Sequence, residues 1–391
     1  MLKFPAVFSV PVFSSVSKTL NAFSVNFRDK RTKENFIILC TSIIHSGSTL
    51  FSQAVKISSC PKDITKALSH FLQSSSWSTE VLDKMRLSLI KRRLTKKIQL
   101  LVIDFTALVK TGKNFEYLSF VHDGRDDRIK PGYALLLALS ITEDNLKLPI
   151  HHRLVNYQHN FRSENLEICQ FLDDLVRLDL AKNELKKAIF LFDRGFDRKI
   201  IVSKLLSLHL SFVVQAKKKI VVLEDGKELL LSKLKNGFYQ NVLIKVWGLK
   251  LNMKVDRRWH KKEKSFIKSV YLTNLDENQF SITKVYRQRW KIEEAIKELK
   301  QSYGLEKFRV RKWQAIQRMV SLCLFCSTLV TLTTSQHYSL LKQILKSIQS
   351  LIHRSRIFKS KTVELLRNIA QILTNFALIS QIKFILATDY G

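Results

Sequence analysis

Cysteine is too scarce and too scattered in this sequence to form a disulfide framework. The chain of 391 residues has five cysteines, and only Cys323 and Cys326 lie close together, in a C-x-x-C spacing. A zinc site would need a second pair of cysteines or histidines nearby, and none follows. Both residues lie inside the apolar run Met319–Leu332. We therefore expect buried helix positions in a reduced, cytoplasmic protein.

Long apolar runs are also lacking. The run Met319–Leu332 is rich in hydroxyl groups and is predicted to be too short for a bilayer, which needs about 20 apolar residues. The stretch Met1–Phe23 is apolar, but its prolines and its single early lysine argue against a signal peptide. We find no internal repeat and no low-complexity tract. The sequence therefore predicts no membrane partner.

Acidic residues are half as frequent as basic ones. The chain has 33 Asp and Glu against 66 Lys and Arg, which gives a formal net charge of +33. Such an excess favours a polyanionic partner and salt-dependent association with nucleic acid. A ribosome-associated or membrane-surface protein could carry the same charge. Neither of these would need isolated carboxylates set into apolar strands, which this chain has.

Both ends of the sequence are predicted to be helical. Residues 1–95 show apolar residues at helical spacing, a turn and helix start at Pro61, and the block Lys91–Lys97 with five cations in seven residues. This pattern fits a helical DNA-binding region, although an ordinary basic helix would look the same. Residues 313–391 contain few glycines or prolines and are predicted to be helical as well.

Strands are predicted between these ends. The near-continuous apolar run Ile98–Phe105 fits a strand buried on both faces of a sheet. Within residues 96–210 the predicted order is three strands, of which this is the first, then a helix, a strand and a helix. This order predicts a mixed α/β sheet. Residues 211–285 are predicted to be a β-rich segment, and residues 286–312 a helix that returns to the sheet.

One face of that last helix gathers charged and aromatic groups. At about 100° per residue, Tyr286, Arg289, Glu293 and Lys300 fall within about 60° of one another around a single helix. Apolar residues occupy the adjoining side, as expected for a helix that lies on a core. One carboxylate is thus flanked by two cations and a phenol, which suits an acid that binds metal beside a phosphate backbone.

Two aspartates end buried strands. Asp104 follows the apolar run that begins at Ile98, and Asp193 follows the run Ala188–Phe192. A lone carboxylate in such a place is costly unless it is paired or binds a cation. Each acid alone could be a solvated strand end or a helix surface residue. Together with Glu293 they predict a site for hard, oxygen-ligated ions, namely two Mg²⁺ ions, with Mn²⁺ as a substitute.

These residues resemble a known family of enzymes. The sequence Y-R-Q-R-W-K-I-E-E-A-I-K-E-L-K from Tyr286 to Lys300 matches the Tyr-Arg-Glu-Lys signature of DDE transposases of the IS-four (insertion sequence four) family. Asp104 in I-D-F-T and Asp193 in F-D-R-G-F-D are similar to the surroundings of the two family aspartates. The resemblance covers about residues 60–315. It implies a ribonuclease-H-like catalytic core with a β-rich insertion, flanked by helical N- and C-terminal regions.

The resemblance also implies a role for each matched residue. Asp104, Asp193 and Glu293 would bind the metal ions and act in catalysis. Arg289 and Lys300 would hold phosphates of the transposon end, and Tyr286 would contact a phosphate near the cleavage site. Glu294 and Glu298 are rivals for the third acid, but both project about 100° or more away from the signature face.

Further DNA contacts are predicted with less direct support. Lys110, Arg194 and Arg287 are either secondary phosphate contacts or ordinary surface charges. Family members stack a flipped base on an aromatic side chain of the insertion. Trp259, which lies among cations, is the better candidate, and Trp247 is the alternative; either could instead belong to the core.

The resemblance implies a cut-and-paste DNA transposase of a bacterial insertion sequence. Such an enzyme would cut at terminal inverted repeats, form a hairpin intermediate and join the ends to double-stranded target DNA, as a homodimer in a synaptic complex. It would act in the cytoplasm, associated with the nucleoid. Two alternatives are a nuclease on the same core without strand transfer, and a basic DNA-binding protein or decayed relic that has lost catalysis.

Overall fold

The strands predicted from residue 98 onward form one 11-stranded sheet. The computed structural model describes residues 9–57, 64–93, 97–112, 114–178, 184–217, 219–260, 265–278 and 281–354. The predicted helix start at Pro61, residues 94–96 of the basic block and the predicted helical tail beyond residue 354 lie outside these ranges. The statements below concern the described residues.

The sheet contains both parallel and antiparallel pairs. Its order is β2-β3-β1-β5-β6-β11-β10-β9-β7-β8, and β4 pairs with β3. The pairs β1–β5 and β5–β6 are parallel, whereas β1–β3 and β3–β4 are antiparallel. The strands are β1 (Ile98–Val109), β2 (Ser119–Asp123), β3 (Arg128–Thr142), β4 (Lys147–Val155), β5 (Ile189–Phe192), β6 (Ser211–Gln215), β7 (Ile220–Val222), β8 (Glu228–Leu230), β9 (Gly237–Ile244), β10 (Leu249–His260) and β11 (Ser265–Thr273).

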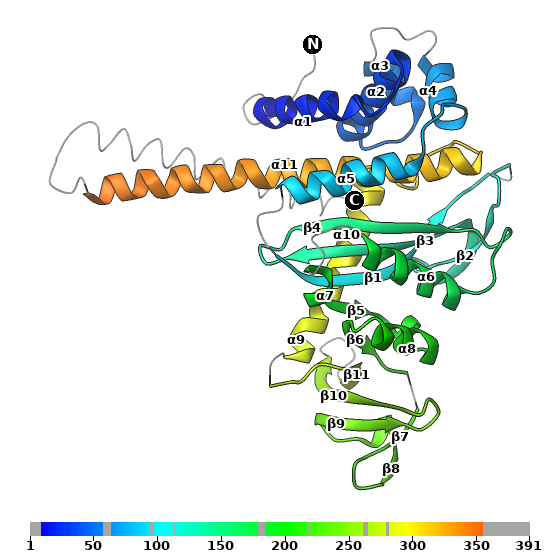
Figure 1. Cartoon of the computed structure of the whole chain (residues 1–391), viewed down its shortest axis with the longest axis vertical. Helices are drawn as coiled ribbons and strands as arrows, with labels where there is room; N and C mark the ends of the chain where they lie inside the picture. The colour runs from blue at the N-terminus through cyan, green and yellow to red at the C-terminus, as the bar shows by residue number, and fades with distance from the viewer. Residues whose placement is uncertain are drawn as a thin grey trace. The chain divides into compact units, whose positions relative to one another are not determined.

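Helices pack against both faces of the central strands (Figure 1). Helices α9 (Ile282–Arg287) and α10 (Lys291–Ser302) contribute apolar side chains to a core with β1, β5 and β6. Helix α6 (Glu164–Arg177) packs on β4, where the Phe171 ring lies 4.6 Å from the His151 ring. Short α7 (Glu184–Lys187) precedes β5, and α8 (Lys199–Ser207) connects β5 to β6. The predicted mixed α/β arrangement is confirmed.

The chain divides into two compact units. One comprises the described residues up to Met85, Glu298–Phe308 and those from Met319; the other comprises Arg86–Lys297 and Arg309–Arg318 and contains the sheet. The helices outside the sheet region are α1 (Ser9–Ser24), α2 (Lys30–Ser46), α3 (Phe51–Ile57), α4 (Ile64–Gln73), α5 (Thr79–Arg93) and α11 (Trp313–Arg354).

The helical unit is held together by aromatic packing and by two close-packed glycines. Phe27 contacts Phe36 and Trp77, and the three side chains are buried. Gly47 ends α2 with a φ of 59°, and Gly304 has a φ of 64°, a region that favours glycine. A Cβ on Gly304 would lie 2.8 Å from Ser48 Cα. Residues 298–308 are thereby packed against the end of α2.

Helix α11 contains the longest apolar stretch among the described residues. Trp313–Ser335 has a mean hydropathy of 1.6 and enough length to cross a membrane, so the prediction that this run is too short was wrong. Its most apolar part is 83% buried inside the protein, as in a helix at the centre of a folded unit. Cys323 and Cys326 are fully buried in this helix, as predicted.

Two strands were missed by the sequence analysis. Strand β4 contains Pro149 and two histidines, and β10 interleaves apolar residues with a dense series of cations. Both strands are defined by pairing with a neighbour, β4 with β3 and β10 with β9 and β11. In addition, β6 pairs in parallel with β5, so the sheet continues without a break into the β-rich segment.

Candidate active site

Two of the predicted acids are neighbours across a parallel strand pair. The last paired residues of β1 and β5 are Ile103 and Phe192, and Asp104 and Asp193 each come next in the chain. Adjacent strands lie about 4.8 Å apart, so these carboxylates stand side by side at the carboxyl end of the pair. The sequence separates them by almost ninety residues, and the parallel register brings them together.

The acids lie on the face of the sheet that α9 and α10 cover. Side chains alternate between the two faces of a strand, which places Asp104 with Val102 and Asp193 with Leu191. Val102 and Leu191 belong to the buried cluster that also contains Ile292 of α10. The two acids therefore follow the apolar residues on the same face of the sheet, next to Arg289 and Glu293.

The signature residues do not lie on one continuous helix. Helix α9 ends at Arg287, residues Gln288–Trp290 form a 3₁₀ turn, and α10 begins at Lys291 and ends at Ser302. The prediction of a single helix through Tyr286 and Lys300 is therefore corrected. The tighter turn lets the chain advance further per residue, and such interruptions often mark functional positions. It contains Arg289.

Arg289 connects the sheet to the helix. Its Nη1 donates to Asp104 Oδ2 at 3.1 Å, and its Nη2 donates to Glu293 Oε1 at 2.5 Å. The guanidinium is only 18% exposed, as is the Asp104 side chain. Arg289 thus joins two of the three predicted acids, and hydrogen bonds between ionised groups of this kind are the stronger ones.

Asp104 holds its proton more tightly than an ordinary aspartate. Burial, followed by the nearby charge of Asp193, raises the pKa of Asp104 to about 7, although Arg289 and the Phe105 amide oppose this change. The Phe105 N–H donates to Asp104 Oδ1 at 2.8 Å. The Gly195 N–H donates to Asp193 Oδ1 at 2.8 Å, which fixes the turn after β5. The positive charge of Arg289 therefore does not fully offset burial and the Asp193 charge, and a bound cation would add to it.

Tyr286 is directed into the sheet rather than toward solvent. Its side chain is buried, its hydroxyl donates to Gln215 Oε1 at 3.2 Å, and its ring lies 4.5 Å from the Tyr271 ring. Burial raises its pKa above the ordinary value. Gln215 ends β6 one register step beyond the pair Phe192 and Val214, next to Asp193.

Gln215 is a site residue that the sequence analysis missed. It is a polar residue at the end of the buried strand Ser211–Gln215, the same signal that identified Asp104 and Asp193. The signal is weaker for an amide, because a neutral side chain costs less to bury than a carboxylate. In the structure Asp104, Asp193 and Gln215 follow the last register positions of the parallel pairs β1–β5 and β5–β6.

The other charges of α10 point elsewhere. Glu294 pairs with Lys147 at 2.8 Å, and the neighbouring Lys291 donates to Asn145 Oδ1. Glu294 is thus paired with the first residue of β4, whereas Glu293 is paired with Arg289. Lys300 pairs with Glu306 at 2.6 Å, within the helical unit. The structure thus brings together Asp104, Asp193, Tyr286, Arg289 and Glu293.

The two tryptophans of the β-rich segment differ sharply in exposure. Trp259 on β10 is 52% exposed, whereas Trp247 is buried, with Lys219 Nζ 3.8 Å from its ring centroid. Trp259 pairs with Phe266 of β11, and their rings meet edge to face at 5.0 Å. Arg257 lies over the Phe266 ring. The exposure therefore supports a position in the protein core for Trp247 but not for Trp259.

Two predicted phosphate contacts also differ in exposure. Arg194, directly after Asp193, is exposed. Lys110 is buried, and its Nζ lies 5.9 Å from the Phe115 ring centroid. Burial of Lys110 agrees with neither alternative predicted for it, a phosphate contact or an ordinary surface charge.

The residues fit a divalent metal by their chemistry. Asp104 and Asp193 offer adjacent carboxylate oxygens, which are the donors that Mg²⁺ prefers. Within the described residues no three Asp, Glu, His or Cys side chains lie close enough together to enclose an ion. Glu293 is instead held by Arg289. The third carboxylate would therefore have to move from the guanidinium to join the pair.

The fold and the site define a class of protein, an α/β protein with two carboxylates side by side on adjacent parallel strands, next to a basic helical segment. Residues 152–329 match a family model described as Transposase DDE domain. This range includes Asp193 and Glu293 and begins after Asp104. A comparison with curated proteins finds no match. The family match supports a DDE transposase, an enzyme that cleaves DNA and transfers strands.

The raised pKa of Asp104 predicts a pH-dependent stability. Its folded pKa of about 7 exceeds the ordinary value of 3.8, so the native state binds this proton more tightly than the unfolded chain. The Asp104 contribution to the free energy of unfolding therefore falls as the pH rises between these two values. We expect Asp104→Asn to remove this decline and to stabilise the protein by about 2 kcal/mol above pH 7.

Urea unfolding of the wild type and of Asp104→Asn over this pH range checks the expectation. The matched control is Asp173→Asn, which should leave the pH profile unchanged. Asp173 is a partly exposed acid of α6 that pairs with Lys204. Parallel declines in the wild type and in Asp104→Asn would show that Asp104 is not the group responsible.

Proposed function

We propose that the protein is a cut-and-paste DNA transposase of the IS-four family with the Tyr-Arg-Glu-Lys signature. The observation that carries this proposal is the joining of Asp104 and Glu293 by Arg289 beside Asp193, within a chain that matches a DDE transposase domain. The strand order, with β5 and β6 parallel to β1 and with β3 and β4 antiparallel, supports a ribonuclease-H-like core.

Asp104, Asp193 and Glu293 are the residues that would hold two Mg²⁺ ions. When bound, such ions supply an activated water or 3′-hydroxyl and stabilise the leaving oxygen of an in-line displacement. The chain itself positions these carboxylates. The parallel register fixes the two aspartates, the Gly195 amide orients Asp193, and the Phe105 amide orients Asp104.

The DNA would be held by the cations and aromatics around these acids. Arg289 suits a phosphate because its guanidinium can donate two parallel hydrogen bonds. Arg194 is exposed next to Asp193, and Lys300 would contact a phosphate further along α10. Tyr286 would act near the cleavage site, where its hydroxyl is held by Gln215.

The remaining assignments follow the same proposal. Residues 1–95 would form a helical DNA-binding region, 96–210 and 286–312 the catalytic core, 211–285 the β-rich insertion and 313–391 a helical C-terminal region. The enzyme would belong to a bacterial insertion sequence, bind terminal inverted repeats and target DNA as a synaptic homodimer, and act in the cytoplasm at the nucleoid. The net charge of +33 supports a DNA partner.

Joining of DNA ends tests this function. Purified protein, Mg²⁺ and a labelled duplex that carries the inverted repeat bordering the gene should yield cleaved ends, hairpins and ends joined to plasmid DNA. Cleavage without joining would favour the nuclease alternative, which the same acids could serve. Binding without cleavage would favour a decayed relic.

Trp259 is the proposed stacking residue for a flipped base. Because it is half-exposed at the end of β10, its removal should not disturb the core. Stacking on an aromatic side chain contributes about 1–3 kcal/mol, so Trp259→Ala should slow hairpin formation by about tenfold or more. Phe120→Ala, which removes another exposed aromatic at β2, is the matched control. Equal rates in the two variants would exclude Trp259 from this role.

A further inference from the structure

We propose that Arg289 is a gate that couples metal binding to DNA binding, an inference that rests on the proposed function. In this view Arg289 holds Glu293 and Asp104 while no phosphate is bound. A DNA phosphate then draws the guanidinium away and releases both carboxylates to the metal ions. Arg289 would thus bind the two carboxylates first and the DNA phosphate afterwards.

The first step of the argument is the occupancy of the acid oxygens. Asp104 Oδ2 accepts from Arg289 at 3.1 Å, while Asp104 Oδ1 accepts from the Phe105 amide at 2.8 Å. Glu293 Oε1 accepts from Arg289 at 2.5 Å. The guanidinium therefore uses one oxygen from each acid and occupies oxygens that a metal ion would need.

The second step is electrostatic. A guanidinium and a divalent ion on the same carboxylates would repel each other, and this repulsion is weakly screened because Arg289 and Asp104 are each only 18% exposed. The metal must therefore displace Arg289 before it can use Asp104 and Glu293 together. Burial also makes an unpaired Arg289 costly, so the side chain needs a new anion when it leaves.

The third step identifies that anion as a phosphate of the DNA backbone. A phosphate can accept two parallel hydrogen bonds from a guanidinium, as a carboxylate pair does. A ligand that favours the released position of Arg289 must strengthen metal binding, and by thermodynamic linkage the metal must strengthen DNA binding by the same factor. The gate would keep the acids from holding metal productively in the absence of DNA.

The cations of α10, which follows the turn that contains Arg289, provide a control. Lys291 is bonded to Asn145 on the opposite side of α10, and Lys300 is paired with Glu306. The hydrogen bond that Lys291 donates goes to Asn145 and not to Asp104 or Glu293. Lys291→Gln therefore removes one positive charge from α10 without opening the gate.

Binding of Mn²⁺ to the full chain, measured by electron paramagnetic resonance, tests the proposal without an activity assay. Without DNA, Arg289→Gln should bind Mn²⁺ about tenfold more tightly than the wild type, and Lys291→Gln should not. Arg289→Lys, which keeps the charge, should stay close to the wild type. A short duplex should tighten Mn²⁺ binding to the wild type but not to Arg289→Gln, after subtraction of ions bound to the duplex alone.

Two outcomes separate the failure of the gate from the failure of the proposed site. If Arg289→Gln binds Mn²⁺ no better than the wild type, or if Arg289→Gln and Arg289→Lys both bind it more weakly, Arg289 positions the acids and the gate is overturned. If Asp193→Asn binds Mn²⁺ as well as the wild type does, the metal site itself is wrong. Circular dichroism of each variant establishes that it is folded.

Discussion

Asp193→Asn is expected to abolish DNA cleavage, with a loss of about a thousandfold or more, while binding to duplex DNA stays within about twofold. Metal ions contribute several kcal/mol of transition-state stabilisation, and each 1.36 kcal/mol is a factor of ten in rate. Asparagine keeps the acceptor oxygen that the Gly195 amide uses, so the turn after β5 should survive. The variant therefore removes a charge from the site without removing the local fold.

Gel shift and cleavage of the same labelled duplex measure both quantities in one preparation. Asp173→Asn, on the surface of α6, is the matched control for the loss of a carboxylate and should cleave at the wild-type rate. Unchanged cleavage by Asp193→Asn would contradict the assignment of the site. A parallel loss of binding and cleavage would point to a folding defect instead.

Asp197→Ala is expected to destabilise the sheet unit by about 3–5 kcal/mol, because it leaves a buried lysine without its partner. Asp197 is fully buried and pairs with Lys219, whose side chain is 9% exposed, at 2.5 Å. The Lys217 amide also donates to Asp197 at 2.5 Å. Burial lowers the pKa of Lys219, although Asp197 opposes this change.

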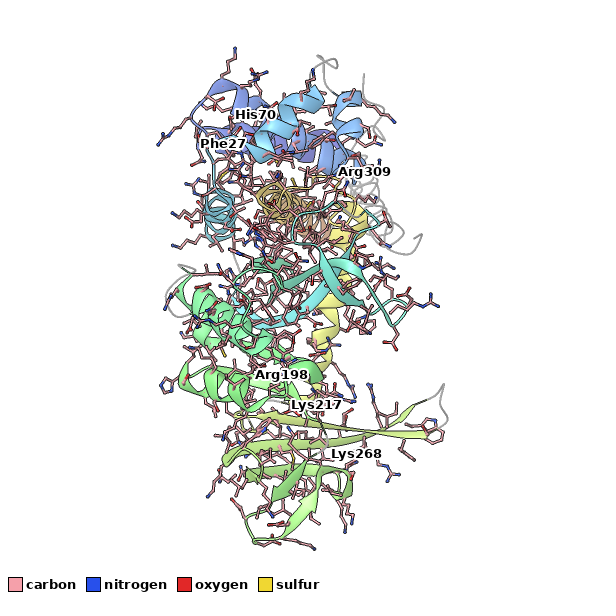
Figure 2. The ribbon with its side chains drawn as sticks, turned by 90° about the vertical axis from the view of Figure 1, so that its right-hand side faces the viewer. Phe27, His70, Arg198, Lys217, Lys268 and Arg309 are labelled. Atoms are coloured by element: carbon pink, nitrogen blue, oxygen red, sulfur yellow. The ribbon has the colours of Figure 1, made fainter. Side chains whose placement is uncertain are left out.

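This ion pair connects the turn that carries Asp193 to the start of the β-rich segment. Asp197 follows the 3₁₀ turn Arg194–Phe196, and Lys219 precedes β7 and lies over the Trp247 ring. Figure 2 shows the labelled neighbours Arg198 and Lys217 close together at this junction, and Lys268 further along on the β-rich segment. Loss of the pair should therefore loosen the segment that carries Trp259.

Urea unfolding, followed by tryptophan fluorescence, measures this effect. The double variant Asp197→Leu with Lys219→Met should recover much of the loss, since a buried pair replaced by apolar groups is often neutral in stability. Asp173→Ala, which breaks a half-exposed pair with Lys204, should cost less than about 1 kcal/mol. A cost below that of Asp173→Ala would show that the Asp197 pair does not hold the junction.

Much of the sheet could be predicted because its central strands are buried on both faces. Continuous apolar runs identified β1 and β5, and β6 lies in the segment that was predicted to be rich in strands. The cation-rich β10 was missed because its identity depends on the strands beside it. The prediction of a single helix through Tyr286 was wrong because residue spacing cannot distinguish a continuous α-helix from one interrupted by a 3₁₀ turn.

The sequence by itself determined the chemical groups of the site and the buried strands that carry them, but the prediction that Asp104 ends its strand was wrong, because β1 continues to Val109 along its antiparallel partner β3. Asp104 and Asp193 follow apolar runs, and a carboxylate at the end of such a run is informative because it is expensive to bury. The net positive charge and the Tyr-Arg-Glu-Lys spacing could likewise be read from the sequence alone.

Only the tertiary structure decided which groups meet. The parallel register of β1 and β5 places Asp104 beside Asp193, Arg289 joins Asp104 to Glu293, and Gln215 receives the Tyr286 hydroxyl. Apart from the i,i+4 pair of Arg289 and Glu293, these contacts join residues far apart in the chain, so local spacing carries no information about them. They depend on strand register, where a shift of one residue would turn each side chain to the opposite face.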